Sequence, residues 1–198
     1  TDYVLVLDAD DYFEGTLPAM LDRDVYELTI VDSTLAYQRL QLFRSVLGLR
    51  YNGIIHETLQ LGAAAVGRLD GLTYRRGKSS YAHQDQDPPA VKYAKHAQLA
   101  TKWLLDHPDD SRMQFYLARS YQDAGQPEAA LREYARRVAM LHGWDEERSY
   151  AAYQIGLIRI QLGQDPTSDL LLASSLGVPK AEPFVALARW YRDDARRQ

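Results

Sequence analysis

The sequence predicts an α/β domain followed by an all-α domain. In the first 87 residues, short segments rich in β-branched and aromatic residues are separated by Asp, Ser, Asn and Gly, a pattern typical of strands. After that the apolar side chains recur at every third or fourth position, the period of amphipathic helices. Residues 85–89, Asp-Gln-Asp-Pro-Pro, have the composition of a linker. We therefore expect domains at 1–87 and 88–198.

Composition narrows the class of protein. The chain has 198 residues, of which 46% are hydrophobic, enough for a packed core. A net charge of -4 offers no global field that would gather nucleic acid or an anionic membrane surface. The absence of cysteine excludes disulfides, zinc-thiolate sites and thiol nucleophiles. No apolar run approaches the ~20 residues of a membrane span. We expect a protein without a membrane span, with the cytoplasm as the preferred compartment.

The first predicted strand covers residues 3–7, Tyr-Val-Leu-Val-Leu, and directly follows Thr1 and Asp2. Because its apolar residues are consecutive, we expect it in the middle of a largely parallel sheet with strands on both sides. Those neighbours would lie upstream of Thr1, so the chain is expected to lack half of a domain. Further strands are predicted at 26–31, 37–43, 53–61 and 69–75, and at most a short helix at 17–23.

The second half predicts helical hairpins. Apolar stripes at helical spacing end at Gly- and Pro-containing turns, and Pro127, Pro166 and Pro183 stand where helices would begin. The stripes are Tyr93, Ala97, Ala100 and Leu104; Met113, Leu117, Tyr121 and Ala124; Ala130, Tyr134, Val138 and Leu141; and Tyr153, Leu157 and Ile160. Trp103, Tyr116, Tyr121, Tyr134 and Tyr153 are expected to be mostly buried between hairpins.

The hairpins also repeat. Leu117-Ala118, Tyr121, Gly125, Ala130 and Tyr134 resemble the tetratricopeptide pattern. A second copy has Ile155-Gly156 and Gly163, with Arg159 in place of the aromatic, and a third begins at Leu187-Ala188 and Tyr191. An irregular helical bundle is the alternative.

A cluster of acidic residues, Asp8-Ala9-Asp10-Asp11, follows the first predicted strand. Carboxylates just beyond the C-terminal end of such a strand face the crevice where α/β folds bind ligands. Two of them side by side repel each other unless a cation lies between them. The segment therefore indicates a divalent metal that would neutralise a diphosphate, and a solvated acidic turn is the alternative.

Three segments resemble the family 2-like, GT-A-type glycosyltransferases, and the resemblance extends over the whole chain. Residues 4–11, Val-Leu-Val-Leu-Asp-Ala-Asp-Asp, are similar to that family's strand and DxD motif. Residues 50–57, Arg-Tyr-Asn-Gly-Ile-Ile-His-Glu, resemble the Tyr-x-Gly-x-x-His-Glu segment of bacterial members that carry tetratricopeptide repeats. Tyr-Ala-His at 81–83 resembles the late histidine of the metal site.

The resemblance implies a fold, cofactors and site residues. The front half would be the C-terminal part of a GT-A catalytic domain. Asp8 and Asp10 would hold the donor ribose and a Mn²⁺ or Mg²⁺ on the diphosphate of a nucleotide sugar, most simply a UDP-sugar. His83 would be a further metal ligand, and a surface histidine beside the linker is the alternative reading of that residue.

His56 and Glu57 close the predicted strand at 53–61, where alternation would send their side chains to opposite faces. An inverting transfer needs a carboxylate that takes the proton of the acceptor hydroxyl. Glu57 is the candidate base, with His56 orienting groups beside it. The alternative is that the pair is structural.

The sequence therefore favours a nucleotide-sugar transferase whose acceptor is a saccharide, a lipid or a protein. A competing interpretation is a non-catalytic repeat scaffold that binds a peptide or protein on its concave face, where Arg119 would lie. A metal-dependent phosphohydrolase using the same aspartates ranks last, because further clustered ligands are lacking.

Overall fold

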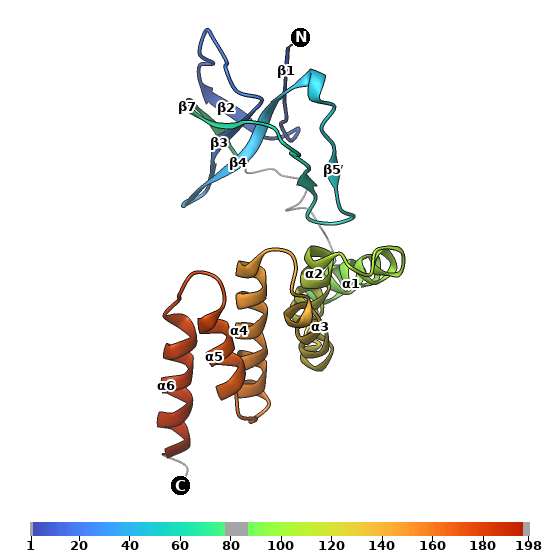
Figure 1. The fold of residues 1–198 in the computed structure, drawn as a ribbon, viewed down its shortest axis with the longest axis vertical. Coiled ribbons are helices and arrows are strands. Elements are labelled where there is room, and N and C mark those ends of the chain that lie inside the picture. Colours follow the sequence, from blue (N-terminus) through green and yellow to red (C-terminus); the bar gives the residue numbers. More distant parts are fainter. Residues whose placement is uncertain (1, 78–86, 196–198) are drawn as a thin grey trace. The chain divides into compact units, whose positions relative to one another are not determined.

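The computed structural model describes residues 2–77 and 87–195, and the chain divides into two compact units (Figure 1). The sheet unit consists of Thr1–Asn52 and Glu57–Gln86. The helical unit consists of Gly53–His56 and Asp87–Gln198. Within the described ranges the first unit holds a mixed sheet and the second holds six α-helices, so the α/β plus α architecture expected from the sequence is present.

The sheet unit is built on five strands in the spatial order β1-β4-β3-β7-β2. Neighbouring strands are antiparallel except β3 and β7, which run parallel. The strands are β1 (Tyr3–Leu5), β2 (Tyr12–Gly15), β3 (Val25–Asp32), β4 (Leu35–Arg44) and β7 (Val66–Arg75).

The three long strands β3, β4 and β7 contain the segments predicted at 26–31, 37–43 and 69–75. β3 lies at the centre, and its Val25, Leu28 and Ile30 are almost completely buried. Side chains of the three strands meet in one apolar cluster of Tyr26, Leu28, Leu42, Leu69 and Leu72. The composition of these segments, rich in β-branched and aromatic residues, was therefore a sufficient signal for the three strands.

The strand predicted at 3–7 is present at residues 3–5, and the upstream neighbours that would place it in the middle of a sheet stay a prediction. In the described structure β1 ends at Leu5, stands at the edge of the sheet order and pairs antiparallel with β4. Its side chains are partly covered, and Val4 is 40% exposed. After Leu5 the chain leaves the ladder, although the Val6 amide still donates to the Gln41 carbonyl at 2.8 Å. A run of apolar residues does not require burial on both faces, because an edge strand can leave part of it in water.

Residues 17–23, where at most a short helix was expected, form none. The prediction of a strand at 53–61 was wrong, because this segment forms no continuous strand. In the second segment β5 (Tyr51–Asn52) and β6 (Thr58–Leu59) pair as a two-stranded ladder, and Gly53–His56 form the bend between them. His56 has a left-handed backbone with φ of 50°, which a strand cannot contain. A single 3-10 turn, Ser45–Leu47, follows β4.

The helical unit is a chain of helices that each pack on the next (Figure 1). They are α1 (Pro89–Asp106), α2 (Ser111–Asp123), α3 (Pro127–Ala139), α4 (Asp145–Gln161), α5 (Thr167–Ser175) and α6 (Glu182–Ala195). The predicted start signals hold to within a residue, since Pro127 opens α3, Pro166 precedes α5 and Pro183 is the second residue of α6.

The turns after α2 and α4, which contain Gly125 and Gly163, are alike. Both glycines are left-handed, with φ of 74° and 68°. The amide of Gln126 donates to the Tyr121 carbonyl at 2.9 Å, and the amide of Gln164 donates to the Arg159 carbonyl at 2.8 Å. These are the six-to-one bonds of a Schellman turn, which satisfies carbonyls that a helix end leaves open. The two hairpins therefore share one turn geometry.

The helical core uses small residues at the crossings and Tyr134 between them. Ala118 and Tyr134 have no exposed surface, and they pack with Ala130, Ala151, Ile155 and other members of one cluster. Of the five aromatics expected to be mostly buried, Tyr134 is fully so, and Trp103, Tyr116, Tyr121 and Tyr153 are half-buried.

The stripe expected on α4 was also wrong. Its buried residues include Ala151, Ala152, Ile155 and Ile158, whereas Tyr153, Leu157 and Ile160 are half-buried. Small residues on α4 are covered because neighbouring helices approach closely there. Among the described residues, no helix combines the length and the apolar character that a membrane span requires.

Candidate functional site

The four acidic-cluster residues 8–11 form the turn that joins β1 to β2. The Asp11 amide donates to the Asp8 carbonyl at 3.1 Å and closes the turn. The three carboxylates differ in environment, since Asp8 is exposed, Asp10 is half-buried and Asp11 retains 8% of its surface. Asp8 therefore faces solvent, Asp11 faces the protein, and Asp10 is intermediate between them.

Both carboxylate oxygens of Asp11 accept hydrogen bonds from residues at or just after the end of β7. Its Oδ2 accepts a short hydrogen bond from the Tyr74 hydroxyl, and its Oδ1 accepts from the Gly77 amide at 2.7 Å. Gly77 lies so close to the turn that a Cβ there would come within 2.0 Å of the Asp10 carbonyl oxygen. Asp11 therefore serves the structure of the turn, and the alternative of a wholly solvated acidic turn does not describe it.

Asp10 has the feature expected of an oxygen ligand. Its Oδ2 atom is buried and has no hydrogen-bond partner among residues 2–77 and 87–195. A buried carboxylate oxygen without a donor is costly unless a cation or a ligand meets it. Mg²⁺ in nucleotide sites is usually held by one or two carboxylates together with substrate phosphates, so Asp8 and Asp10 suit such an ion. Within residues 2–77 and 87–195, no cluster of three or more His, Asp or Glu side chains is placed to bind a metal.

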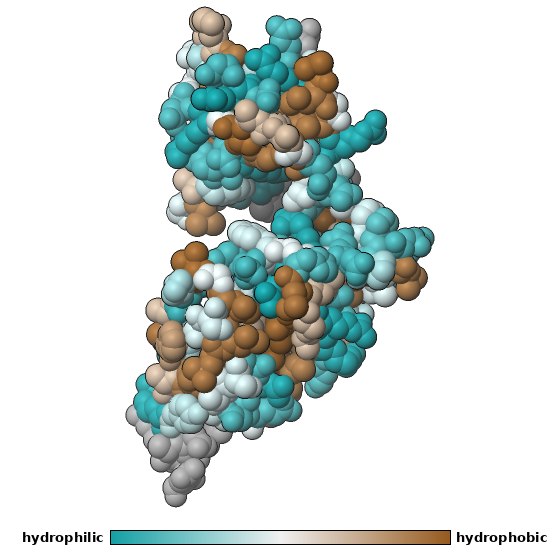
Figure 2. Space-filling view, viewed as in Figure 1, coloured by the Kyte–Doolittle hydropathy of each residue, from teal (hydrophilic) through white to brown (hydrophobic). Residues whose placement is uncertain are grey.

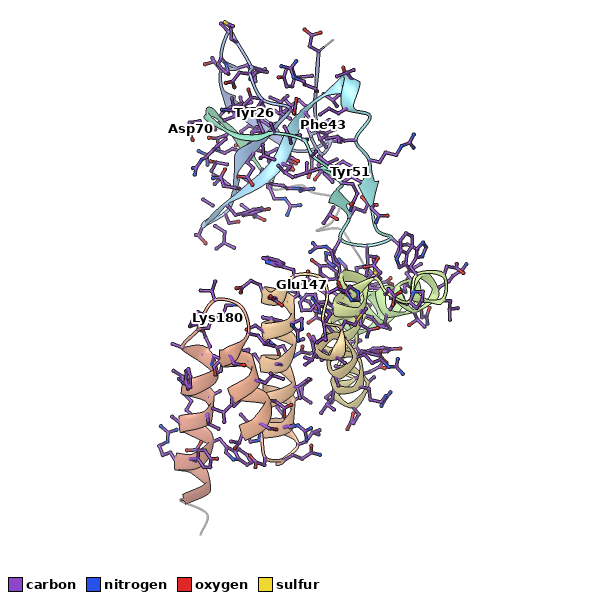
Figure 3. The ribbon with its side chains drawn as sticks, viewed as in Figure 1. Tyr26, Phe43, Tyr51, Asp70, Glu147 and Lys180 are labelled. Carbon is purple, nitrogen blue, oxygen red and sulfur yellow. The ribbon has the colours of Figure 1, made fainter. Side chains whose placement is uncertain are left out.

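The carboxylates of Asp8 and Glu57 both affect the pKa of Tyr51. Burial raises the pKa of Tyr51, Arg39 opposes the rise, and the carboxylates of Asp8 and Glu57 add to it. Figure 3 labels Tyr51 on the short β5 ladder. Asp8, Glu57 and Arg39, all in the sheet unit, thus lie near enough to Tyr51 to affect its pKa. The period and spacing of the sequence carried no signal for Arg39.

His56 and Glu57 belong to different units of the chain. Although the two are adjacent in sequence, Gly53–His56 group with the helices, and Glu57 belongs to the sheet unit. The His56 ring stacks on Tyr116 of α2 with centroids 4.0 Å apart and planes 14° apart. Ile55 packs on the cluster formed by Ala97, Ala100, Met113 and Leu117. The expected alternation of His56 and Glu57 along a strand was therefore wrong, because the chain bends at His56.

The surroundings of His56 are cationic. Burial lowers the pKa of His56 below its ordinary 6.5, and Arg119, His96 and Arg112 lower it further. His96 presents its edge to the His56 ring, with centroids 6.3 Å apart. The remaining predicted ligand, His83, lies outside the described residues.

The helical unit also contains a groove between α2 and α4 with a volume of about 370 Å³. Aromatic side chains form much of its wall, and Trp144 and Tyr150 keep 62% and 39% of their surfaces exposed. Figure 3 labels Glu147 and Lys180, which lie on its lining, and Figure 2 shows hydrophobic residues exposed on the helical unit. The full lining is Arg112, Phe115, Tyr116, Arg119, Trp144, Glu146, Glu147, Tyr150 and Lys180.

Ion pairs beneath the groove fix its cations. Arg112 donates to Glu147 Oε1 at 2.7 Å and to the Tyr116 hydroxyl at 3.1 Å. Arg137, whose side chain is completely buried, donates to the Trp144 carbonyl at 2.8 Å and lies 3.7 Å from Glu147 Oε2. The side chain of Arg119 is half-exposed, and its Nε atom lies 3.8 Å from Asp123 Oδ2. Arg119 is thus the groove cation with the loosest ion pair.

No protein-family model matches the sequence, and a search of curated proteins finds no match either. The resemblance to glycosyltransferases therefore depends on the short motifs at 4–11, 50–57 and 81–83 alone.

Proposed function

We propose that the chain belongs to a nucleotide-sugar-dependent glycosyltransferase, in which the sheet unit is part of a GT-A-type catalytic domain and the helical unit is a tetratricopeptide-like repeat array. The observation that carries the proposal is the turn at 8–11, where Asp10 keeps a buried carboxylate oxygen without a protein donor. The nearby Glu57, which shares the environment of Tyr51 with Asp8, supports it.

The proposed roles follow from chemistry. A bound Mn²⁺ or Mg²⁺, held by Asp8, Asp10 and His83, would neutralise the negative charge that develops on the departing diphosphate. Glu57 takes the proton of the acceptor hydroxyl while that oxygen attacks the anomeric carbon. The bond from the anomeric carbon to the diphosphate breaks, and the nucleoside diphosphate leaves with the electron pair. Because His56 packs on the helices, its role moves from orienting substrate groups to anchoring the 53–56 bend.

Release of UDP from a panel of UDP-sugars, with Mn²⁺ and with a chelator, tests the proposal. Mn²⁺-dependent release that falls at least ~100-fold in Glu57→Gln when an acceptor is present would support it, since a general base contributes about that much. A Glu27→Gln variant, on β3, serves as the matched control. Absence of Mn²⁺-dependent release from every donor would contradict the transferase.

A second candidate, a non-catalytic scaffold for a peptide or protein, is favoured by the groove between α2 and α4, with its exposed Trp144 and loosely paired Arg119. Arg119→Glu separates the two. If the groove holds the acceptor, the variant raises the acceptor Michaelis constant without changing the melting temperature or donor hydrolysis. If the protein is a scaffold, the variant abolishes partner capture in a protein that never turns over a nucleotide sugar.

A further inference from the structure

One oxygen atom, the hydroxyl of Tyr74, hydrogen-bonds to both ends of the turn at 8–11. The hydroxyl of Tyr74 accepts a hydrogen bond from the Asp8 amide at 3.3 Å and donates one to Asp11 Oδ2. Asp8 and Asp11 are the first and last residues of the turn, and Asp10, with its unpartnered oxygen, lies between them. The position of this hydroxyl therefore fixes the backbone from which both free carboxylates project.

Tyr74 is well suited to act as a fixed point. It lies on β7 with 1% of its surface exposed, opposite Phe13 of β2 and Ile30 of β3. The Phe13 ring meets it edge-on, with centroids 5.3 Å apart and planes 87° apart. A ring packed on both sides by strand neighbours has little freedom to move its hydroxyl.

Asp11 supplies the second attachment. Both of its oxygens accept from the end of β7, one from Tyr74 and one from the Gly77 amide. Any side chain at Gly77 would collide with the Asp10 carbonyl, so the strand end and the turn are in direct backbone contact. Three contacts thus tie the turn to one central strand.

We propose that Tyr74 and Asp11 are positioning residues that set the direction of the Asp8 and Asp10 carboxylates toward a divalent cation and its nucleoside diphosphate. The inference rests on the proposed function, because the ligand is the one proposed there. Neither residue touches the ligand. Residues behind a metal ligand typically change metal affinity by about 10- to 100-fold when they are altered.

Tyr74→Phe removes the hydroxyl and keeps the ring against Phe13. In this variant we expect the affinity for Mn²⁺ in the presence of UDP to fall at least ~10-fold, measured by Mn²⁺ electron paramagnetic resonance titration, with little change in melting temperature. The matched control is Tyr37→Phe, on the exposed part of β4, which should bind as wild type does. Asp11→Asn, which places an amide opposite the Tyr74 hydroxyl, is the second variant, and it should weaken binding in the same way.

Two measurements distinguish positioning from general stability. In an Asp10→Ala background, Tyr74→Phe should cause a smaller loss of Mn²⁺ affinity than in wild type, because only Asp8 is left to position, whereas a merely structural effect would add in full. Amide hydrogen exchange at Asp8, which needs no ligand, should accelerate at least ~10-fold in Tyr74→Phe because its acceptor is gone. If wild type, Tyr74→Phe and Asp11→Asn all bind Mn²⁺ with UDP equally well, the positioning role is overturned and the proposed function is not. A wild-type protein that binds no Mn²⁺ with UDP would overturn the proposed function and, with it, this inference.

Discussion

His56 stacks face to face on Tyr116, with ring centroids 4.0 Å apart, although the residue that follows His56 belongs to the other unit of the chain. The bend at 53–56 is therefore part of the helical unit, and its backbone adopts a left-handed conformation at His56 to reach that position. A non-glycine residue in this region of φ carries a cost that its surroundings must offset. Here the stack on Tyr116 and the contact of Ile55 with the α1 and α2 cluster offset it.

The first prediction concerns pH. The pKa of His56 is lowered in the folded state. As the pH falls below 6.5, the ordinary pKa of histidine, His56 is therefore protonated in the unfolded chain before it is protonated in the folded chain. The stability of the helical unit should therefore fall as pH decreases through that window, and the contribution of His56 should be constant above it. Urea unfolding of the helical unit, followed by circular dichroism between about pH 5 and pH 7.5, measures this.

His56→Phe keeps the stack on Tyr116 and cannot be protonated, so its stability should depend less on pH over the same range than that of wild type. The groups that face His56 are Arg112, Tyr116 and Arg119 on α2 and His96 on α1. Parallel pH profiles for the two proteins would contradict the prediction.

The second prediction compares two adjacent arginines on α3. The side chain of Arg137 is completely buried and lies 3.7 Å from Glu147, whereas that of Arg136 is 68% exposed beside Glu133. Arg137→Met should lower the free energy of unfolding by about 3–5 kcal/mol, because Glu147 loses its fully buried partner and keeps only Arg112, whose side chain is 37% exposed. Arg136→Met should change it by less than about 1 kcal/mol. Chemical unfolding of both variants decides, and equal losses would show that burial of Arg137 contributes nothing.

The third prediction concerns the crossing of α4 and α5. A Cβ on Gly156 would come within 2.7 Å of Leu170 Cγ, and Leu170 is 1% exposed and cannot move aside. Gly156→Ala should therefore destabilise the helical unit by about 1–3 kcal/mol through overpacking, despite the better helix propensity of alanine.

A double-mutant cycle provides the control for this crossing. In a Leu170→Ala background the clash is absent, so Gly156→Ala should be neutral or stabilising there. If the substitution is stabilising in the wild-type background as well, the close approach of the two helices is refuted.

The sequence predicted the positions of the central strands and the helices well, and it predicted less well which of their side chains are buried. The segment at 26–31 was recognised as a strand by its β-branched and aromatic residues, and in the structure Tyr26, Leu28 and Ile30 alternate on a buried face of β3. On α4 helical spacing did not identify the buried face, because Ala151 and Ala152 are buried at helix crossings while the larger Tyr153 and Leu157 line the wall of a second cavity of about 660 Å³ beside α6. Residue size does not reveal which face another helix will cover.

The candidate site was predictable in part. Asp8 and Asp10 were found from their place after a strand, and the third carboxylate, Asp11, was not separated from them. Its partners, Tyr74 and Gly77, lie more than 60 residues away in sequence, and tertiary pairing of β7 with β2 brings them together. His56 and Glu57 were placed on one strand because the Ile-rich segment has strand composition, and the contact of Ile55 with α1 and α2 overrides that local preference.

The central claim is that Asp8 and Asp10 hold a divalent cation together with a nucleoside diphosphate, and calorimetric titration of UDP with Mn²⁺ into the protein tests it most directly. Asp10→Asn keeps the shape of the side chain and removes its charge, and Asp70→Asn, whose side chain is 83% exposed beside Arg68, is the matched control. The account predicts Mn²⁺-dependent binding in wild type and Asp70→Asn, and a loss of at least ~10-fold in affinity for Asp10→Asn. Equal binding of Mn²⁺ and UDP by wild type and Asp10→Asn would contradict it.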